Sequence, residues 1–175
     1  MGAEDRESLF TRWLDGHGGA VLKVARAYTL TAEDRRDLVQ EILLRVWTSL
    51  PGYRGEAGLS TWSYRVALNT ALDWHGKEKR RRGRQRPIIE VEDPPDPGPD
   101  GPRQAARREL VERLYAAIRR LPPADAALVL LYLDDLSYRE MAEVLGISES
   151  NVGVKLNRAR KALGELLKED SHGHK

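Results

Sequence analysis

The chain has 175 residues, of which 41% are hydrophobic and 32% charged, and its formal net charge is +2. This composition is too apolar for a fully disordered chain and fits one domain or two small ones. The lack of cysteine excludes disulfides, thiolate catalysis and zinc–thiolate sites. No apolar run approaches the roughly 20 residues that span a bilayer, and the N-terminal acids are unlike a secretion signal. We therefore expect a cytoplasmic protein with no membrane insertion.

The first half of the chain, residues 1–82, is predicted to contain four helices. One apolar stripe over residues 9–14 is ended by the glycines at 16, 18 and 19, and a second stripe covers residues 21–28. No segment alternates apolar and polar residues as a strand would, so we expect the fold class to be all-α.

The third predicted helix carries the sequence DLVQEILLRVW and has two contrasting faces. Thr31, with Asp34 three residues later, resembles a capping box that opens it, and Pro51 ends it. Its predicted buried row is Val39, Leu43, Val46, Trp47 and Leu50. The opposite face carries Asp37, Gln40, Glu41 and Arg45. An acid-and-amide face is unexpected in a chain with long basic segments.

The fourth predicted helix begins near Ser60 and runs into the basic sequence KEKRRRGRQR, residues 77–86. Thr61, Arg65, Asn69 and Asp73 form an i, i+4 row along it. Trp62 lies at its start, beside a loop that holds Tyr53 and Arg54. Rings beside cations suit single-stranded nucleic acid, because unpaired bases stack on rings while phosphates meet positive charge. An ordinary core with a solvated basic helix end explains the same residues equally well.

Residues 83–103 are predicted to be a linker, because the basic segment is followed by PIIEVEDPPDPGPDGP, rich in proline, glycine and acids. Each proline lacks an amide donor and disfavours helical geometry in the residue before it. We therefore expect a semi-extended connection between two small helical domains, residues 1–82 and 104–169. A polar tail is predicted over residues 170–175. His172 and His174 in that tail could chelate a metal only weakly.

The second domain ends in a pattern typical of a helix-turn-helix. Ser137 with Glu140 predicts a capping box, and Gly146 suits a left-handed C-cap. The helix that follows is predicted to bury Val152, Leu156, Ala159 and Leu163. Its outward face carries Asn151, Lys155, Arg158 and Lys161. Amide and cationic donors suit base edges and phosphates, so we favour a DNA-binding helix-turn-helix over an ordinary helical hairpin.

Taken in order, DLVQE, STWSYRVALNTALD and the terminal helix-turn-helix resemble bacterial sigma factors of the small extracytoplasmic-function (ECF) class. These keep the second and fourth conserved sigma regions, joined by a variable linker. The resemblance implies a protein that binds core RNA polymerase, recognises the −35 and −10 promoter elements and promotes promoter melting. It also implies an anti-sigma factor as a partner, and no cofactor or enzymatic activity of its own.

The resemblance also assigns three sets of residues. Those facing the clamp helices of the polymerase β′ subunit are Asp37, Gln40, Glu41, Leu44 and Arg45. Those at the −10 element are Tyr53, Arg54, Ser60, Thr61, Trp62, Arg65 and Asn69. Those at the −35 element are Ser148, Ser150, Asn151, Lys155 and Arg158. Acids opposite a basic coiled coil are complementary, whereas acids opposite DNA phosphates are repelled, which explains the unusual face of the third helix.

The sequence departs from the family pattern at Leu43, where many relatives carry phenylalanine, and in the −35 set. Gly153 and Val154 stand where many relatives carry a basic residue and a serine, so the −35 contacts are expected to differ in detail. The linker is expected to thread through the polymerase, and the β subunit is a second expected contact.

Two other interpretations remain open at this stage. A stand-alone helix-turn-helix regulator would bind duplex DNA without polymerase, usually at a two-fold symmetric site. A helical adaptor would bind no nucleic acid and would leave the basic residues as surface charge. DLVQE with the aromatic and basic fourth helix favours the sigma interpretation, since a repressor needs neither.

Overall fold

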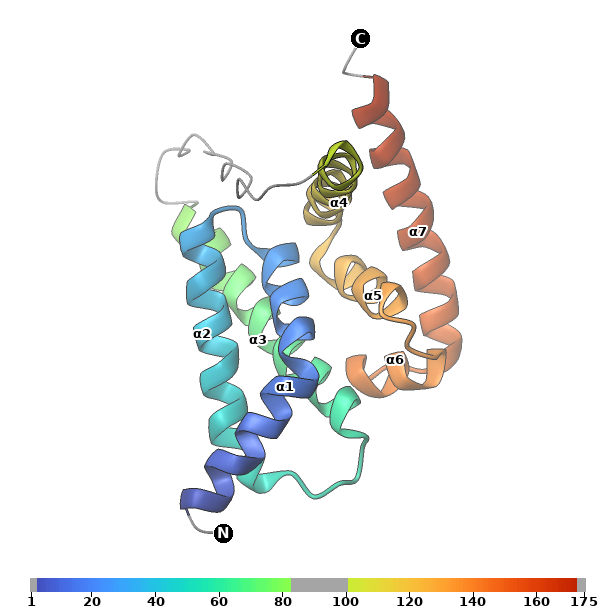
Figure 1. The fold of residues 1–175 in the computed structure, drawn as a ribbon. Helices are drawn as coiled ribbons and strands as arrows, with labels where there is room; N and C mark the ends of the chain where they lie inside the picture. Colours follow the sequence, from blue (N-terminus) through green and yellow to red (C-terminus); the bar gives the residue numbers. More distant parts are fainter. Residues whose placement is uncertain (1–2, 83–100, 173–175) are drawn as a thin grey trace.

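The computed structural model describes residues 3–82 and 101–172, and every regular element in these two segments is a helix (Figure 1). The N-terminal half consists of α1 (Ala3–Tyr28), α2 (Ala32–Ser49), the 3-10 helix η1 (Leu50–Gly52) and α3 (Leu59–Arg82). The C-terminal half consists of α4 (Pro102–Arg120), α5 (Pro123–Leu133), α6 (Tyr138–Leu145) and α7 (Glu149–His172). The all-α prediction is confirmed for these residues. Most of the predicted linker, residues 83–100, and His174 lie outside them.

α1 is one continuous helix, so the prediction of two helices separated at the glycines is wrong. Trp13 before the glycines and Val21 and Val24 after them are buried, with exposed fractions of 1%, 2% and 0%. Burying a large apolar side chain contributes about 1.5–3 kcal/mol, more than the roughly 1 kcal/mol that a helical glycine costs. Packing against α2 and α3 therefore carries α1 through a segment that local propensity would interrupt.

α2 begins at the predicted cap, and Val46 and Leu50 of the predicted row are buried. In the first part of the helix the most buried row is shifted by one residue from the predicted row. Thr31 Oγ1 accepts a hydrogen bond from the Asp34 amide at 3.0 Å. The buried residues are Leu38, Ile42 and Val46, followed by Leu50. Val39, Leu43 and Trp47 of the predicted row are only partly buried. The shift arises because α2 packs against both α1 and α3, so its contact face is broader than one row.

The start of α3 has a fixed position relative to α1. Trp13 Nε1 donates to Ser63 Oγ at 2.6 Å, and Ser63 Oγ donates to the Leu59 carbonyl at 2.6 Å. Trp13 and Ser63 are both buried, so this short chain of hydrogen bonds is shielded from water. These hydrogen bonds therefore also fix the position, relative to α1, of the residues that follow Ser63 on α3.

The C-terminal half contains the predicted helices with two shifted boundaries. α4 begins at Pro102, slightly before the predicted domain start at residue 104, because proline is favoured in the first turn of a helix. α7 continues to His172, so the prediction of a tail from residue 170 is wrong for residues 170–172. Arg120 of α4 pairs with Glu169 at 3.0 Å and with Asp170 at 3.2 Å, and so stabilises this last part of α7.

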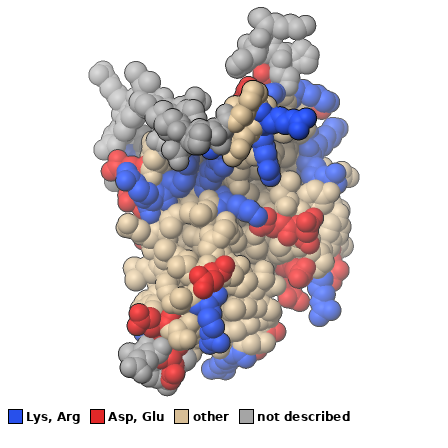
Figure 2. Space-filling model, viewed as in Figure 1, with Lys and Arg blue, Asp and Glu red and all other residues tan. Residues whose placement is uncertain are grey.

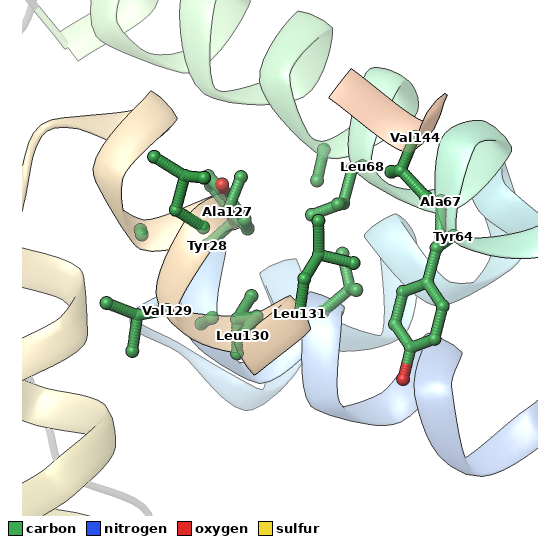
Figure 3. Close-up of a cluster of buried hydrophobic side chains, with 14 of the residues drawn as sticks. Tyr28, Tyr64, Ala67, Leu68, Ala127, Val129, Leu130, Leu131 and Val144 are labelled. Carbon is green, nitrogen blue, oxygen red and sulfur yellow. The ribbon is translucent and has the colours of Figure 1, made fainter. Parts of the chain in front are cut away.

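The two halves pack against each other through apolar side chains of α3, α5 and α6. In Figure 3, Leu131 of α5 and Val144 of α6 lie next to Leu68 and Ala67 of α3. All four side chains are buried. One continuous apolar core therefore runs through both halves.

Polar contacts between α1 and the two ends of α5 also join the two halves. The hydroxyl of Tyr28 donates to the Pro123 carbonyl at 2.7 Å, and burial raises the pKa of this phenol. Lys23 of α1 forms an ion pair with Asp134, just after α5. The Lys23 side chain is 51% exposed, and an ion pair with such access to water usually contributes no more than about 1 kcal/mol, so the apolar contacts dominate between the two halves.

Candidate nucleic-acid and partner interfaces

The face of α2 opposite its buried row is acidic, with one exposed apolar side chain. Asp37 and Gln40 are exposed, and Glu41 is half-buried. Leu44 exposes 59% of its surface. A leucine among acids suits a protein surface that offers both apolar contact and positive charge. The structure thus brings the members of the predicted α2 set together on one side of the helix.

Arg45 completes this face and is held by two acids. Its Nη2 lies 3.6 Å from Glu41 Oε1, and its Nη1 lies 3.1 Å from Asp73 Oδ2 of α3. Sequence spacing had grouped Asp73 with residues along α3, and the contact with Arg45 across 28 positions has no signal in the sequence. The one positive charge of Arg45 stands against the negative charges of Glu41, Asp73 and Asp37, so these four side chains together remain net negative.

The second candidate set gathers around the turn that precedes α3. The rings of Tyr53 and Trp62 have centroids 5.4 Å apart and planes at 50°. The Tyr53 hydroxyl donates to the Ala57 carbonyl at 2.5 Å, which closes the turn. Gly55 has φ +75°, a left-handed conformation that glycine adopts without strain. The turn therefore holds two half-buried rings beside the exposed side chain of Arg54.

The other members of this set have different environments. Ser60 and Asn69 are exposed, whereas Thr61 is 4% exposed and does not present its hydroxyl at the surface. Arg65 Nη2 donates to the backbone carbonyl of Glu143 in α6 at 2.6 Å. Five of the seven predicted side chains are therefore at least partly exposed around the turn: Tyr53, Arg54, Ser60, Trp62 and Asn69. Thr61 is buried, and Arg65 is hydrogen-bonded to the helix-turn-helix.

α6 and α7 form the predicted helix-turn-helix, and its local signals are confirmed. The Ser137 amide donates to Glu140 Oε2 at 2.8 Å, and the Glu140 amide donates to Ser137 Oγ at 3.2 Å, which completes the capping box. Ser137 Oγ also donates to Glu140 Oε2 at 2.7 Å. This hydrogen bond, together with the one from the Ser137 amide, holds the pKa of Glu140 below its ordinary value. Gly146 has φ +67°, and its amide donates to the Ala142 carbonyl at 2.9 Å. The left-handed turn brings the start of α7 next to α6.

The two faces of α7 are as predicted. The buried row is Val152, Leu156, Ala159 and Leu163. Asn151, Lys155 and Arg158 are exposed on the other side. Ser148 Oγ accepts a hydrogen bond from the Asn151 amide at 3.3 Å and lies 3.1 Å from Ser150 Oγ, so Ser148 also caps the helix.

Charge is unevenly distributed over the surface. In Figure 2, lysine and arginine gather in the upper part of the view, around the end of α3 and the start of α4. Acids form a separate patch near the turn between α5 and α6. A net charge of +2 therefore conceals distinct basic and acidic regions.

Models of known protein families match both halves of the chain. The model of sigma-70 region 2 matches residues 13–81, and the model of sigma-70 region 4 matches residues 111–163. The chain belongs to the sigma-70 family. Region 2 contains α2 and α3 with the first two candidate sets, and region 4 contains the helix-turn-helix. Neither matched model describes an enzyme family.

Its relatives are sigma factors of the ECF class. It is 30% identical over 162 residues to ECF RNA polymerase sigma factor SigM of Mycobacterium tuberculosis, covering 92% of this chain and 76% of the relative. It is 30% identical over 150 residues to the ECF RNA polymerase sigma-E factor of Haemophilus influenzae, covering 81% and 79%. It is 32% identical over 187 residues to SigG of M. tuberculosis, covering 92% of this chain but only 49% of SigG. The chain thus spans about half the length of SigG.

Two solved structures share the fold. CnrH, in complex with the cytosolic domain of CnrY, has a TM-score of 0.65 and 25% identity, covering 92% of this chain and 88% of CnrH. RpoE from Bartonella quintana, in complex with the anti-sigma factor NepR, has a TM-score of 0.71 and 21% identity, covering 91% and 96%.

Searches of the described segments for two other kinds of site were negative. Within residues 3–82 and 101–172, no helix is long and apolar enough to cross a membrane. The same residues contain no group of three or more His, Asp or Glu side chains that could hold a metal ion.

Proposed function

We propose that this chain is an ECF sigma factor that binds core RNA polymerase, recognises the −35 and −10 promoter elements and promotes strand separation. The observation that carries the proposal is the presence of three distinct surfaces on one chain. These are the acidic face of α2, the rings and cations at the start of α3, and the amide-and-cation face of α7. A protein that only bound duplex DNA would need the last of these alone. As a sigma factor, the chain would be a non-catalytic subunit acting in the cytoplasm.

The α2 face is the proposed contact with the clamp helices of the β′ subunit. Asp37 and Glu41 would be complementary to a basic coiled coil, which favours encounter and excludes partners of the wrong charge. Leu44 would supply apolar contact, since covering a leucine contributes about 1–2 kcal/mol when roughly half of its surface is already buried. The acids determine which partner is met, and Leu44 adds to the affinity.

The turn before α3 is the proposed site for an unpaired base of the −10 element. Stacking of a base on an aromatic ring contributes about 1–3 kcal/mol, and Tyr53 and Trp62 offer two rings. Taking a base out of the duplex stack costs a few kcal/mol. Because the two quantities are of similar size, the turn can trap an open strand but needs the free energy of polymerase binding to open it.

α7 is the proposed reader of the −35 duplex. In helix-turn-helix proteins the second helix lies in the major groove and its N-terminal residues contact base edges. Asn151 offers an amide suited to adenine, and Arg158 offers a cation suited to guanine or phosphate. Lys155 offers positive charge to the backbone. This surface would bind DNA as a duplex, unlike the turn before α3.

An anti-sigma factor is the proposed regulatory partner, supported by the complex of RpoE with NepR. Such a partner would compete with polymerase if it covered the α2 face. Chemical crosslinking of the native complex should then protect residues 37–47. A crosslink map that leaves this segment accessible would refute the proposed mode of inhibition.

Gel filtration with sigma-free bacterial core polymerase tests the main proposal. The chain and core polymerase are mixed with and without a library of promoter fragments. We expect co-elution and enrichment of fragments that share two spaced motifs. Binding of duplex DNA by the chain alone, with no co-elution, would instead establish the stand-alone regulator.

A further inference from the structure

Val154 is an apolar side chain in the middle of the polar face of α7. It is 72% exposed, the largest fraction among the exposed large hydrophobic side chains of the described residues. At about 100° per residue, it lies on the side of α7 opposite the buried Val152. Asn151 and Arg158 lie one turn to either side of it, and both are exposed. A valine therefore stands where the proposed −35 contacts are made.

The fold of the protein gives no reason for a valine at this position. A β-branched residue has a lower helix propensity than lysine or alanine, and an exposed site offers little burial to offset the difference. Gly153 beside it contributes no side chain and lies against the ring of Tyr138, since a Cβ on Gly153 would be 3.5 Å from Tyr138 Cε2. Position 153 therefore adds neither a charge nor a side chain that could cover Val154.

The chemistry of the major groove restricts what an isopropyl group can recognise. The base edges there present hydrogen-bond donors and acceptors, and the one apolar group is the C5-methyl of thymine. Opposite cytosine, adenine or guanine, a valine would exclude water from a polar group without replacing its hydrogen bond, which is unfavourable. Contact with thymine is favourable, and contact with the other bases is penalised.

We propose that Val154 reads a thymine in the −35 element through contact between its isopropyl group and the C5-methyl in the major groove. The inference rests on the proposed function, because it requires α7 to bind the −35 duplex. The thymine should lie between the base pairs nearest Asn151 and Arg158, since these residues flank Val154 along the helix. Burial of one methyl group corresponds to about a four-fold gain in affinity.

Replacement of that thymine by uracil tests the proposal, because uracil keeps the base pair and lacks only the methyl group. The full chain is assembled with core polymerase, and its −35 element is selected from a random library. Duplexes containing thymine or uracil at each position are then compared. We expect wild-type holoenzyme to bind one uracil duplex about four-fold more weakly. In Val154→Ala the ratio should fall toward one.

Lys155→Ala is the matched control on the same face. It should weaken binding to both duplexes and leave their ratio at about four-fold, because it removes charge and not apolar contact. Val154→Ala should fold normally, since the side chain is exposed and alanine has the higher helix propensity. Thermal unfolding followed by circular dichroism checks this.

Each other outcome overturns the inference in a recognisable way. A thymine preference that survives in Val154→Ala would show that another residue reads the methyl group. A selected −35 element with no sensitivity to uracil would show that no methyl is read. Weaker binding of Val154→Ala to core polymerase would assign the side chain to a protein contact. Failure of the holoenzyme to select any −35 element would remove the proposed function itself.

Discussion

α2 and α7 are built alike but present opposite surfaces. Each is an amphipathic helix that starts at a side-chain cap, Thr31 for α2 and Ser148 for α7, and each buries one apolar side in the core. The outward side of α2 carries acids around Leu44, whereas that of α7 carries an amide and cations around Val154. The common scaffold fixes only where each face points. The chemistry of a few exposed side chains determines whether the partner is a protein or DNA.

The largest expected effect is on the α2 side of this comparison. Asp37→Ala combined with Gln40→Ala should weaken binding to core polymerase on the order of 30-fold or more, because complementary charge at the contact is lost. Co-elution and a quantitative binding assay measure it. The matched control, Glu109→Ala with Gln104→Ala on the exposed face of α4, should bind normally. Equal losses in both variants would show that α2 is not a distinct face.

On the α7 side, Lys155→Ala should change the salt dependence of binding to the −35 duplex. Loss of one phosphate contact lowers the slope of log K against log salt by about 0.9, through the release of one fewer counterion. Lys155→Arg keeps the charge and should keep the slope. The double substitution on α2 should leave the slope unchanged. A change of slope in the α2 variant would show that the α2 face also contacts DNA.

Two glycines near the start of α7 should respond to alanine in opposite directions. Gly153→Ala should raise the free energy of unfolding by about 1 kcal/mol, because a helix interior favours alanine. Its Cβ would meet the Tyr138 ring at an ordinary contact distance of 3.5 Å. Gly146→Ala should lower it by about 1–2 kcal/mol, because Gly146 has φ +67°. Urea unfolding measures both, and a shared sign would contradict the assigned turn.

The smallest expected effect is a pH dependence at the capping box of α6. Hydrogen bonds from Ser137 hold the pKa of Glu140 below its ordinary value of 4.5, so its ionised form is favoured in the folded protein. This stabilisation should be complete above about pH 4.5 and should disappear as the pH falls through the folded pKa. Glu140→Gln lacks the titration. Its difference in stability from the wild type should therefore shrink in acid, and a constant difference from pH 7 to pH 3 would contradict this account.

Local signals predicted the helix-turn-helix well because single residues there determine the backbone. Ser137 and Glu140 can satisfy each other's amides only at a helix start, and a left-handed turn leaves few choices besides glycine at 146. At Gly16 and Gly19 the same kind of reasoning failed. There the backbone is helical, and burial of Trp13 and Val21 on either side outweighs the low propensity.

The candidate faces were predictable as patterns along single helices, whereas the contacts between helices were not. The exposed acids of α2 and donors of α7 follow from helical spacing. The pairing of Arg45 with Asp73 and the hydrogen bond from Arg65 to Glu143 join residues 28 and 78 positions apart. Such contacts depend on how whole helices pack, which spacing within one helix does not encode.

The hydrogen bond from Arg65 to the Glu143 carbonyl has a consequence for measured affinities. The hydrogen bond occupies one of the five N–H donors of the Arg65 guanidinium and restricts the reach of the side chain. Full release of Arg65 toward the −10 element would require this bond between α3 and α6 to break. If the bond must break, the apparent affinity for the −10 strand would be the intrinsic affinity multiplied by the fraction of molecules in which α3 and α6 are apart, here called the open fraction. An open fraction of about 1% would weaken binding roughly 100-fold.

Core polymerase would then act as an effector that raises this open fraction. Fluorescent labels on exposed positions of α3 and α6 should move apart when core polymerase is added and stay close when DNA alone is added. An unchanged separation in the presence of polymerase would mean that the closed arrangement is itself the active one.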